Sequence, residues 1–133
     1  MQDRPTAIEL LTAVREFIEH DVVPGLDGRK RFHALVAANV IAVVTRELEE
    51  EETLLVGEWR RLRDLVQLDD AAPPGRLSGL RAAVRALNER LVERIRAGDA
   101  DAGSFADAVR AHVRTTVAEK LRVANPKMLG SAP

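Results

Sequence analysis

The segment from Phe32 to Val44 constrains the fold more than any other part of the chain. His33 and Asn39 are its only polar residues, and its apolar residues cover every side of a helical wheel. A helix without a polar face has to be surrounded by other helices, because water would otherwise contact its apolar side chains. We therefore expect residues 29–49 to form the central helix of a bundle.

The flanking segments show the spacing of amphipathic helices, with apolar residues three and four positions apart. Thr6 and Glu9 have the spacing of a capping box and predict the start of the first helix, which Pro24 and Gly25 end. We expect the central helix to stop at residues 50–53, because the run of glutamates there suits the positive end of a following helix. The remaining helices are expected at residues 54–68, 77–97 and 104–123.

No segment alternates polar and apolar residues as a half-buried strand does. The sequence therefore predicts an all-α fold, a compact antiparallel bundle of about five helices. The 133 residues suit a single domain, which we place at 1–126 with a flexible tail at 127–133. The helix at 77–97 has a narrow apolar stripe that indicates either a seam within the monomer or a homodimer contact. The stripe consists of Leu77, Leu80, Val84, Leu87, Leu91 and Ile95.

Charge and composition exclude several classes of protein. The formal net charge of −1 gives no field that would attract nucleic acid or anionic lipid. There is no cysteine, which excludes disulfides, a thiol nucleophile and cysteine-bound metals. No stretch approaches the ~18 apolar residues of a membrane span, and the N-terminus lacks the apolar run of a signal peptide. We expect a cytoplasmic protein without nucleic-acid or membrane partners.

The usual catalytic patterns are missing. No serine lies on a strained turn beside a histidine, and no histidine follows a glutamate by three positions as in a di-iron bundle. The loop that starts at Asp99 resembles a calcium loop weakly, but Arg110 stands where a bidentate glutamate is required. Glycine-rich phosphate loops are also missing. We therefore expect no catalytic residues, no metal ligands and no cofactor.

Polar residues within apolar faces are the remaining candidates for a site. Asn39 shares a helical face with Phe32, Val36 and Val43, and Arg46 follows two turns further along. We expect Asn39 to be buried and hydrogen-bonded, so that Asn39→Ala would cost ~1 to 3 kcal/mol. Its partner is either a structural group that sets the position of the helix or a ligand.

His112, Thr116 and Lys120 repeat every four residues on the expected last helix. Each has a structural interpretation: a core histidine, a threonine bonded to the carbonyl four residues earlier, and a lysine that extends to solvent. In the functional interpretation they converge with Asn39 on one cavity, and Arg46 is a further candidate. These five residues are the candidate ligand-binding set.

Several strings of residues resemble a small bacterial family of domains of unknown function. They are QDRPT near the start, GRKRFHALVAANVIAVVTRELE in the centre and KLRVANPK near the end. The resemblance covers residues 2–128, and Leu35 stands where the family pattern has arginine. The positions that match this pattern are Arg31, His33, Asn39, Arg46, Glu47, Lys120, Asn125 and Pro126.

The resemblance implies a functional setting. Members of this family are typically encoded beside aminoglycoside-phosphotransferase-like kinases and acyl-CoA dehydrogenases, which implies a role in the breakdown of hydroxyacyl-CoA thioesters. The first hypothesis is accordingly a non-catalytic partner of such a kinase. The alternative is a bundle that binds a small acyl-CoA or phosphate-bearing molecule, or a modest enzyme, and a third possibility is a homodimer with a structural role.

Overall fold

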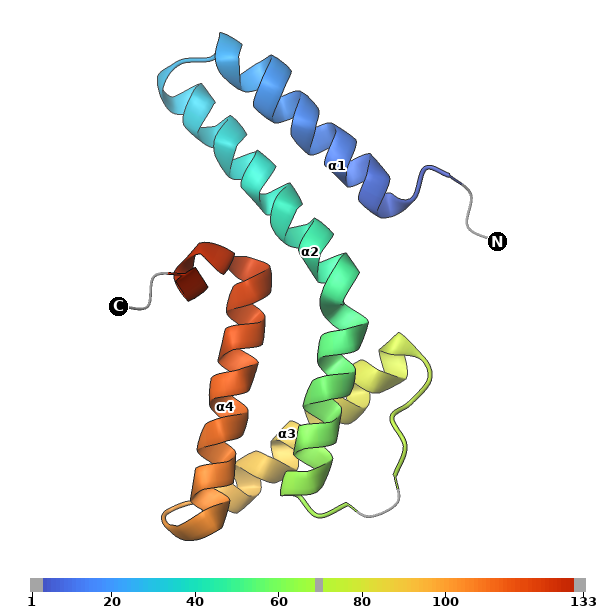
Figure 1. Ribbon diagram of the computed structural model, residues 1–133, viewed down its shortest axis with the longest axis vertical. Helices are drawn as coiled ribbons and strands as arrows, with labels where there is room; N and C mark the ends of the chain where they lie inside the picture. Colours follow the sequence, from blue (N-terminus) through green and yellow to red (C-terminus); the bar gives the residue numbers. More distant parts are fainter. Residues whose placement is uncertain (1–3, 69–70, 131–133) are drawn as a thin grey trace. The chain divides into compact units, whose positions relative to one another are not determined.

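The computed structural model describes residues 4–68 and 71–130, and every regular element within these ranges is a helix. The expected all-α class is thereby confirmed. The contacts divide the chain into two compact units. The first unit comprises Met1–Glu51 with Val123–Asn125, and the second comprises Glu52–Arg122 with Pro126–Pro133. Figure 1 shows the elements along the chain.

In the first unit, α1 (Ala7–Phe17) continues into a π-helical turn, η1 (Ile18–Val22), and a 3₁₀ turn, η2 (Val23–Gly25). The predicted capping box is confirmed at the start of α1. The Thr6 amide donates to the Glu9 carboxylate at 2.7 Å, and the Glu9 amide donates to the Thr6 hydroxyl at 3.2 Å. These bonds satisfy two backbone donors that have no partner within the helix.

The long helix α2 (Gly28–Leu65) joins two segments that were expected to be separate helices. The predicted break at residues 50–53 is wrong, and the described ranges contain four α-helices rather than about five. Glutamate has a high helix propensity, and residues 50–53 contain neither proline nor glycine that would interrupt the backbone hydrogen bonds. The preference of carboxylates for a helix N-terminus is a smaller effect, and it does not end the helix here.

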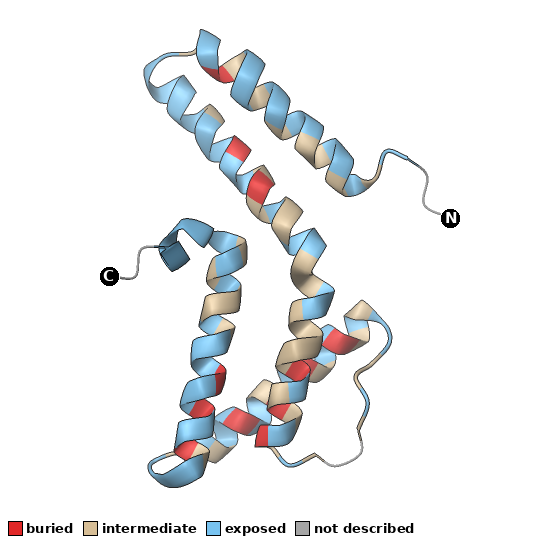
Figure 2. Cartoon of the chain, in the orientation of Figure 1, coloured by how far each residue is buried: buried red, intermediate tan, exposed pale blue. Residues whose placement is uncertain are grey.

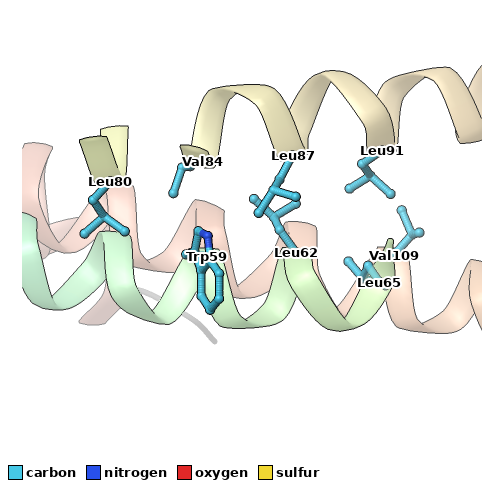
Figure 3. Packing of buried hydrophobic residues seen from close by; sticks show 8 residues of the cluster. All are labelled: Trp59, Leu62, Leu65, Leu80, Val84, Leu87, Leu91 and Val109. Carbon is cyan, nitrogen blue, oxygen red and sulfur yellow. The ribbon is translucent and has the colours of Figure 1, made fainter. Parts of the chain in front are cut away.

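The second unit contains the main apolar core. It is formed by the C-terminal part of α2, by α3 (Leu77–Arg96) and by α4 (Gly103–Ala124). In Figure 3 side chains of α2 meet the stripe of α3, so the predicted seam lies within this unit. The buried cluster consists of Trp59, Leu62, Leu65, Leu80, Val84, Leu87, Leu91 and Val109.

The connections match the turn residues of the sequence. Gly98 follows α3 with a φ of +92°, a left-handed conformation that is natural for glycine after a helix. Residues 69–70 of the expected loop and 131–133 of the expected tail lie outside the described residues. Within the expected tail, Pro126–Gly130 form a 3₁₀ turn, η3.

The N-terminal part of α2 is covered on one side only. Ala38 and Ala42 are buried, whereas Phe32, Val36 and Val40 are exposed (Figure 2). The expectation that this segment is covered all round is therefore wrong. Among its described residues the first unit contains only one other long helix, α1, and one helix cannot cover every side of its neighbour.

Candidate functional site

The second unit contains a cluster of polar side chains in its interior. His112, on α4, is the only polar residue classed as buried among the described residues, and only 6 % of its surface is exposed. The pKa of His112 is influenced by three charged side chains, those of Glu58 and Arg61 on α2 and that of Glu119 on α4. The cluster extends to α3, because the amide nitrogen of Asn88 donates to the Glu58 carboxylate at 2.9 Å.

Arg61 and Glu119 form a two-pronged ion pair. The two terminal nitrogens of the guanidinium donate to the two carboxylate oxygens, at 3.0 and 2.5 Å. The side chains are only 26 % and 16 % exposed, so water screens the pair less than it screens a surface pair. The pair joins α2 to α4 within this unit and fixes the direction of both side chains.

His112 is held in its neutral form. Burial is the main reason why its pKa lies below 6.5, and the positive charge of Arg61 lowers the pKa further. The carboxylates of Glu58 and Glu119 act in the opposite direction. A neutral imidazole has one donor and one acceptor nitrogen, so His112 can form hydrogen bonds of both kinds.

Three buried polar atoms in this region have no hydrogen-bond partner among the described residues. They are Nε of Arg61, Nδ1 of His112 and the hydroxyl oxygen of Thr116. The expected bond from Thr116 to the carbonyl four residues earlier is absent, and Thr115 instead donates to the Ala111 carbonyl at 3.1 Å. Buried polar groups without partners are uncommon in proteins and reduce stability.

A cavity of about 600 Å³ lies between the end of α2 and the first half of α4. Leu65 and Phe105 give it an apolar surface, and Ala108 and Ala111 leave space because their side chains are small. The full lining consists of Arg61, Asp64, Leu65, Gln67, Ser104, Phe105, Ala108, Ala111, His112 and Thr115. Cavities of this size accommodate small molecules.

Arg94 of α3 fixes two walls of the cavity. It donates to the Leu65 carbonyl at 2.7 Å, and its guanidinium carbon lies 4.0 Å from the centre of the Phe105 ring. Asp99 accepts a further bond from Arg94 at 2.9 Å. Arg61, which also lines the cavity, is fixed by its ion pair. These contacts hold the cavity walls in place without a ligand.

The chemistry of the cavity suits a ligand that is apolar in part. Its histidine is neutral near pH 7, and the charges of Arg61 and Asp64 are offset by Glu119 and Arg63. Within residues 4–68 and 71–130 no group of three or more histidine, aspartate or glutamate side chains is arranged to hold a metal ion. An amphipathic molecule with an apolar part and hydrogen-bonding oxygens fits this environment.

The candidate residues from the sequence fall into both units. Asn39 and Arg46 belong to the first unit, and His112, Thr116 and Lys120 belong to the second, so neither unit contains all five. Asn39 is exposed and has no hydrogen bond among the described residues, so the expectation of a buried, bonded amide is wrong. Lys120 is exposed, and Arg46 donates to the Val123 carbonyl at 2.7 Å.

Sequence reasoning missed the partners of His112. Arg61 and Glu58 are three positions apart on α2, so both lie on the face of this helix that enters the cluster. Glu119 follows His112 by two turns and shares its face of α4. Their spacing was a signal, but charged residues at such positions are far more often exposed. The contact between α2 and α4 was needed to identify them. His33, in the first unit, is exposed and accepts a hydrogen bond from Arg29 at 3.1 Å.

In the described residues no helix combines the length and the apolar character needed to cross a bilayer. The fold defines an all-α protein of two helical units, the second with a polar cluster beside a cavity. A family model described as "Domain of unknown function (DUF6285)" matches residues 24–128. The chain therefore belongs to this family. No curated protein and no solved structure matches the chain.

Proposed function

We propose that the protein is a non-catalytic accessory subunit that binds a kinase-like phosphotransferase acting in the breakdown of hydroxyacyl-CoA thioesters. The observation that carries this proposal is the amount of apolar surface that the chain leaves exposed. Fifteen large hydrophobic side chains among the described residues are at least 39 % exposed, and both units contribute to them. Where such side chains form a contiguous patch, they mark a site of protein interaction.

The outer face of α4 is the part of the second unit that fits a protein partner. Val113 and Val117 are 49 % and 50 % exposed, and they are one helical turn apart. Arg114 and Lys120, which are also exposed, flank them on the same helix. An apolar centre with a basic rim fits an acidic surface of the partner, because opposite charges favour the correct encounter. We call Val113, Arg114, Val117 and Lys120 the α4 patch.

The kinase setting comes from the family resemblance, and co-expression with an aminoglycoside-phosphotransferase-like kinase from the same organism tests it. We expect the two proteins to elute together in size-exclusion chromatography and the kinase to be more active in the complex. Val117→Asp should separate them, because it places a charge at the centre of the α4 patch. Val92→Asp, at a valine of α3 that is 43 % exposed, is the matched control and should leave the complex intact. Separate elution of the parent proteins at micromolar concentration, with unchanged kinase activity, would contradict the proposal.

The cavity beside His112 supports a second candidate function, the binding of a small acyl-CoA or phosphate-bearing molecule. Its apolar lining suits an acyl chain better than a phosphate, because Glu119 already offsets the charge of Arg61. Titration calorimetry with butyryl-CoA and with inorganic phosphate separates the two ligand types. Ala108→Trp fills the cavity and should abolish binding, whereas Ala86→Trp on the exposed side of α3 should not. Equal binding by both variants would exclude this cavity as the site.

A further inference from the structure

The exposed side of α2 in the first unit has a regular apolar ridge. Five large side chains follow one another at intervals of four residues, and each is between 39 % and 62 % exposed. We call this set the α2 ridge: Phe32, Val36, Val40, Val44 and Leu48. Ala38 and Ala42, which are buried, lie on the opposite side of the helix. The ridge therefore exposes several hundred Å² of apolar surface, about as much as the largest patch of a typical monomer.

The charges at the two ends of the ridge have opposite signs. Arg29, Lys30 and Arg31 precede Phe32, whereas Glu47 and Glu49 lie on either side of Leu48. The basic and acidic ends are thus about equally far from Val40, which is the middle residue of the ridge. A surface with this distribution of charge is complementary to a copy of itself that runs in the opposite direction.

We propose that the α2 ridge is a homodimer interface in which the α2 helices of two chains run antiparallel about a two-fold axis near Val40. In this arrangement Phe32 meets Leu48 of the second copy, Val36 meets its Val44, and Val40 meets its Val40. Arg31 then lies opposite Glu49 of the second copy. A parallel arrangement would bring like charges together at both ends, which is unfavourable.

Helix geometry supports close packing at the centre of the ridge. Residues spaced by four form a row that is inclined by about 26° to the helix axis. When two such rows lie side by side, the helices cross at roughly 50°, the commonest angle in globular proteins. Val36, Val40 and Val44 then pack against the partner, Phe32 and Leu48 flank this contact, and α1 of each chain covers the other side of its own α2. A two-fold axis makes this contact self-complementary and closed.

The occupant of the ridge is therefore a second copy of this chain, whereas the α4 patch is the surface assigned to the kinase. The proposal does not depend on the proposed function, because it is tested on the isolated protein. We expect sedimentation equilibrium to show a dimer at micromolar concentration that weakens as salt is raised. Val40→Asp should give a monomer with an unchanged helical circular dichroism spectrum, and Val117→Asp should remain a dimer. A parent protein that is monomeric under these conditions would overturn the proposal, and so would a Val40→Asp variant that is folded and dimeric.

Cysteine cross-linking tests the direction of the helices, because the natural chain has no cysteine. Val40→Cys should form a disulfide-linked dimer on mild oxidation, since the two copies of this residue meet at the axis. Phe32→Cys alone should not, because its two copies lie about 24 Å apart at 1.5 Å per residue. A mixture of Val36→Cys and Val44→Cys should cross-link. Glu16→Cys, at an exposed position of α1, is the control and should stay unlinked. Cross-linking of Phe32→Cys with itself would overturn the antiparallel arrangement.

Charge reversal tests the pairing of the ends. Arg31→Glu should weaken the dimer at low salt, because it places a second carboxylate opposite Glu49 of the other copy. Glu49→Arg should weaken the dimer in the same way, because it brings two guanidinium groups together. Mixing the two variants restores opposite charges across one end of the interface, so the mixed dimer should be tighter than either homodimer. A mixture that associates no better than the separate variants would contradict the proposed pairing.

Discussion

At the scale of single residues, the most informative side chain is His112. Burial beside Arg61 keeps its imidazole neutral, and two carboxylates limit the fall of its pKa. The same residue lines the cavity, so its protonation state affects stability and would also affect the ligand binding proposed for this cavity. This coupling gives a measurable dependence on pH.

We predict that His112 makes the protein less stable in mild acid. The folded-state pKa lies below 6.5, so the unfolded chain takes up this proton at a higher pH than the folded protein does. The stability that the protein gains from keeping His112 neutral is complete above the pKa of the unfolded chain. It is lost as the pH falls through 6.5 toward the lower pKa of the folded protein. Urea unfolding at about pH 7.5 and about pH 5.5 should show a smaller fall in the free energy of unfolding for His112→Gln than for the parent. Equal falls would show that His112 is not the titrating group.

Asn39 gives a second prediction at this scale. Its amide is exposed, so Asn39→Ala should change the free energy of unfolding by no more than about 0.5 kcal/mol. The sequence predicted a loss of ~1 to 3 kcal/mol on the premise that the amide was buried. Urea unfolding at low protein concentration distinguishes the two values, and a loss above about 1 kcal/mol would mean that Asn39 has a buried partner.

At the scale of elements, the continuity of α2 is the main finding. Its 38 residues run from the first unit into the second without a break. The negative charge of the glutamates at residues 49–52 suggests the start of a helix. Glutamate also has a high propensity for the interior of a helix. A substitution within this run separates the two interpretations.

Proline at Glu50 tests whether the helix is continuous. Glu50→Pro should destabilise the protein by about 3 kcal/mol, because proline removes a backbone donor and collides with the preceding turn. Glu50→Ala controls for loss of the side chain and should have little effect. Ala72→Pro, in the loop before α3, is a second control. A stability of Glu50→Pro within about 0.5 kcal/mol of Glu50→Ala would indicate a break in the helix at this position.

At the scale of the whole molecule, the two units differ in how much they bury. The second unit contains the cluster around Trp59 and Leu62, whereas the buried residues of the first unit are smaller, namely Val23, Ala38 and Ala42. A core of small side chains contributes less free energy, because stabilisation follows the apolar area removed from water. The first unit should therefore open more easily than the second.

Hydrogen exchange tests this difference in stability. Amides of α3 between Leu80 and Leu91 should exchange slowest, and those of α1 should exchange fastest among the α-helices. If the α2 ridge binds a second copy, protection of the N-terminal part of α2 should rise with protein concentration, and Val40→Asp should abolish the rise. Equal protection of α1 and α3 in dilute solution would contradict the assignment of the weaker core to the first unit.

Local sequence signals predicted the helical class, the capping box at Thr6 and the seam of α3. Each of these depends on residues within one or two turns of each other, where hydrogen bonds and helical spacing act directly. The same local reasoning placed a break at residues 50–53 by giving the helix dipole more weight than helix propensity. The candidate residue His112 was also found by its position within an apolar face.

The environment of each residue depended on contacts between distant segments. Apolar residues on every side of α2 predicted burial, but only the side with Ala38 and Ala42 is covered, because the first unit contains one other long helix. Asn39 is therefore exposed, and its neighbours form a surface. Likewise, Arg61 and Glu119 are 58 positions apart in the chain, and their pairing beside His112 arises where α2 packs against α4. Helical spacing identifies the face of a residue, but not what the fold places against that face.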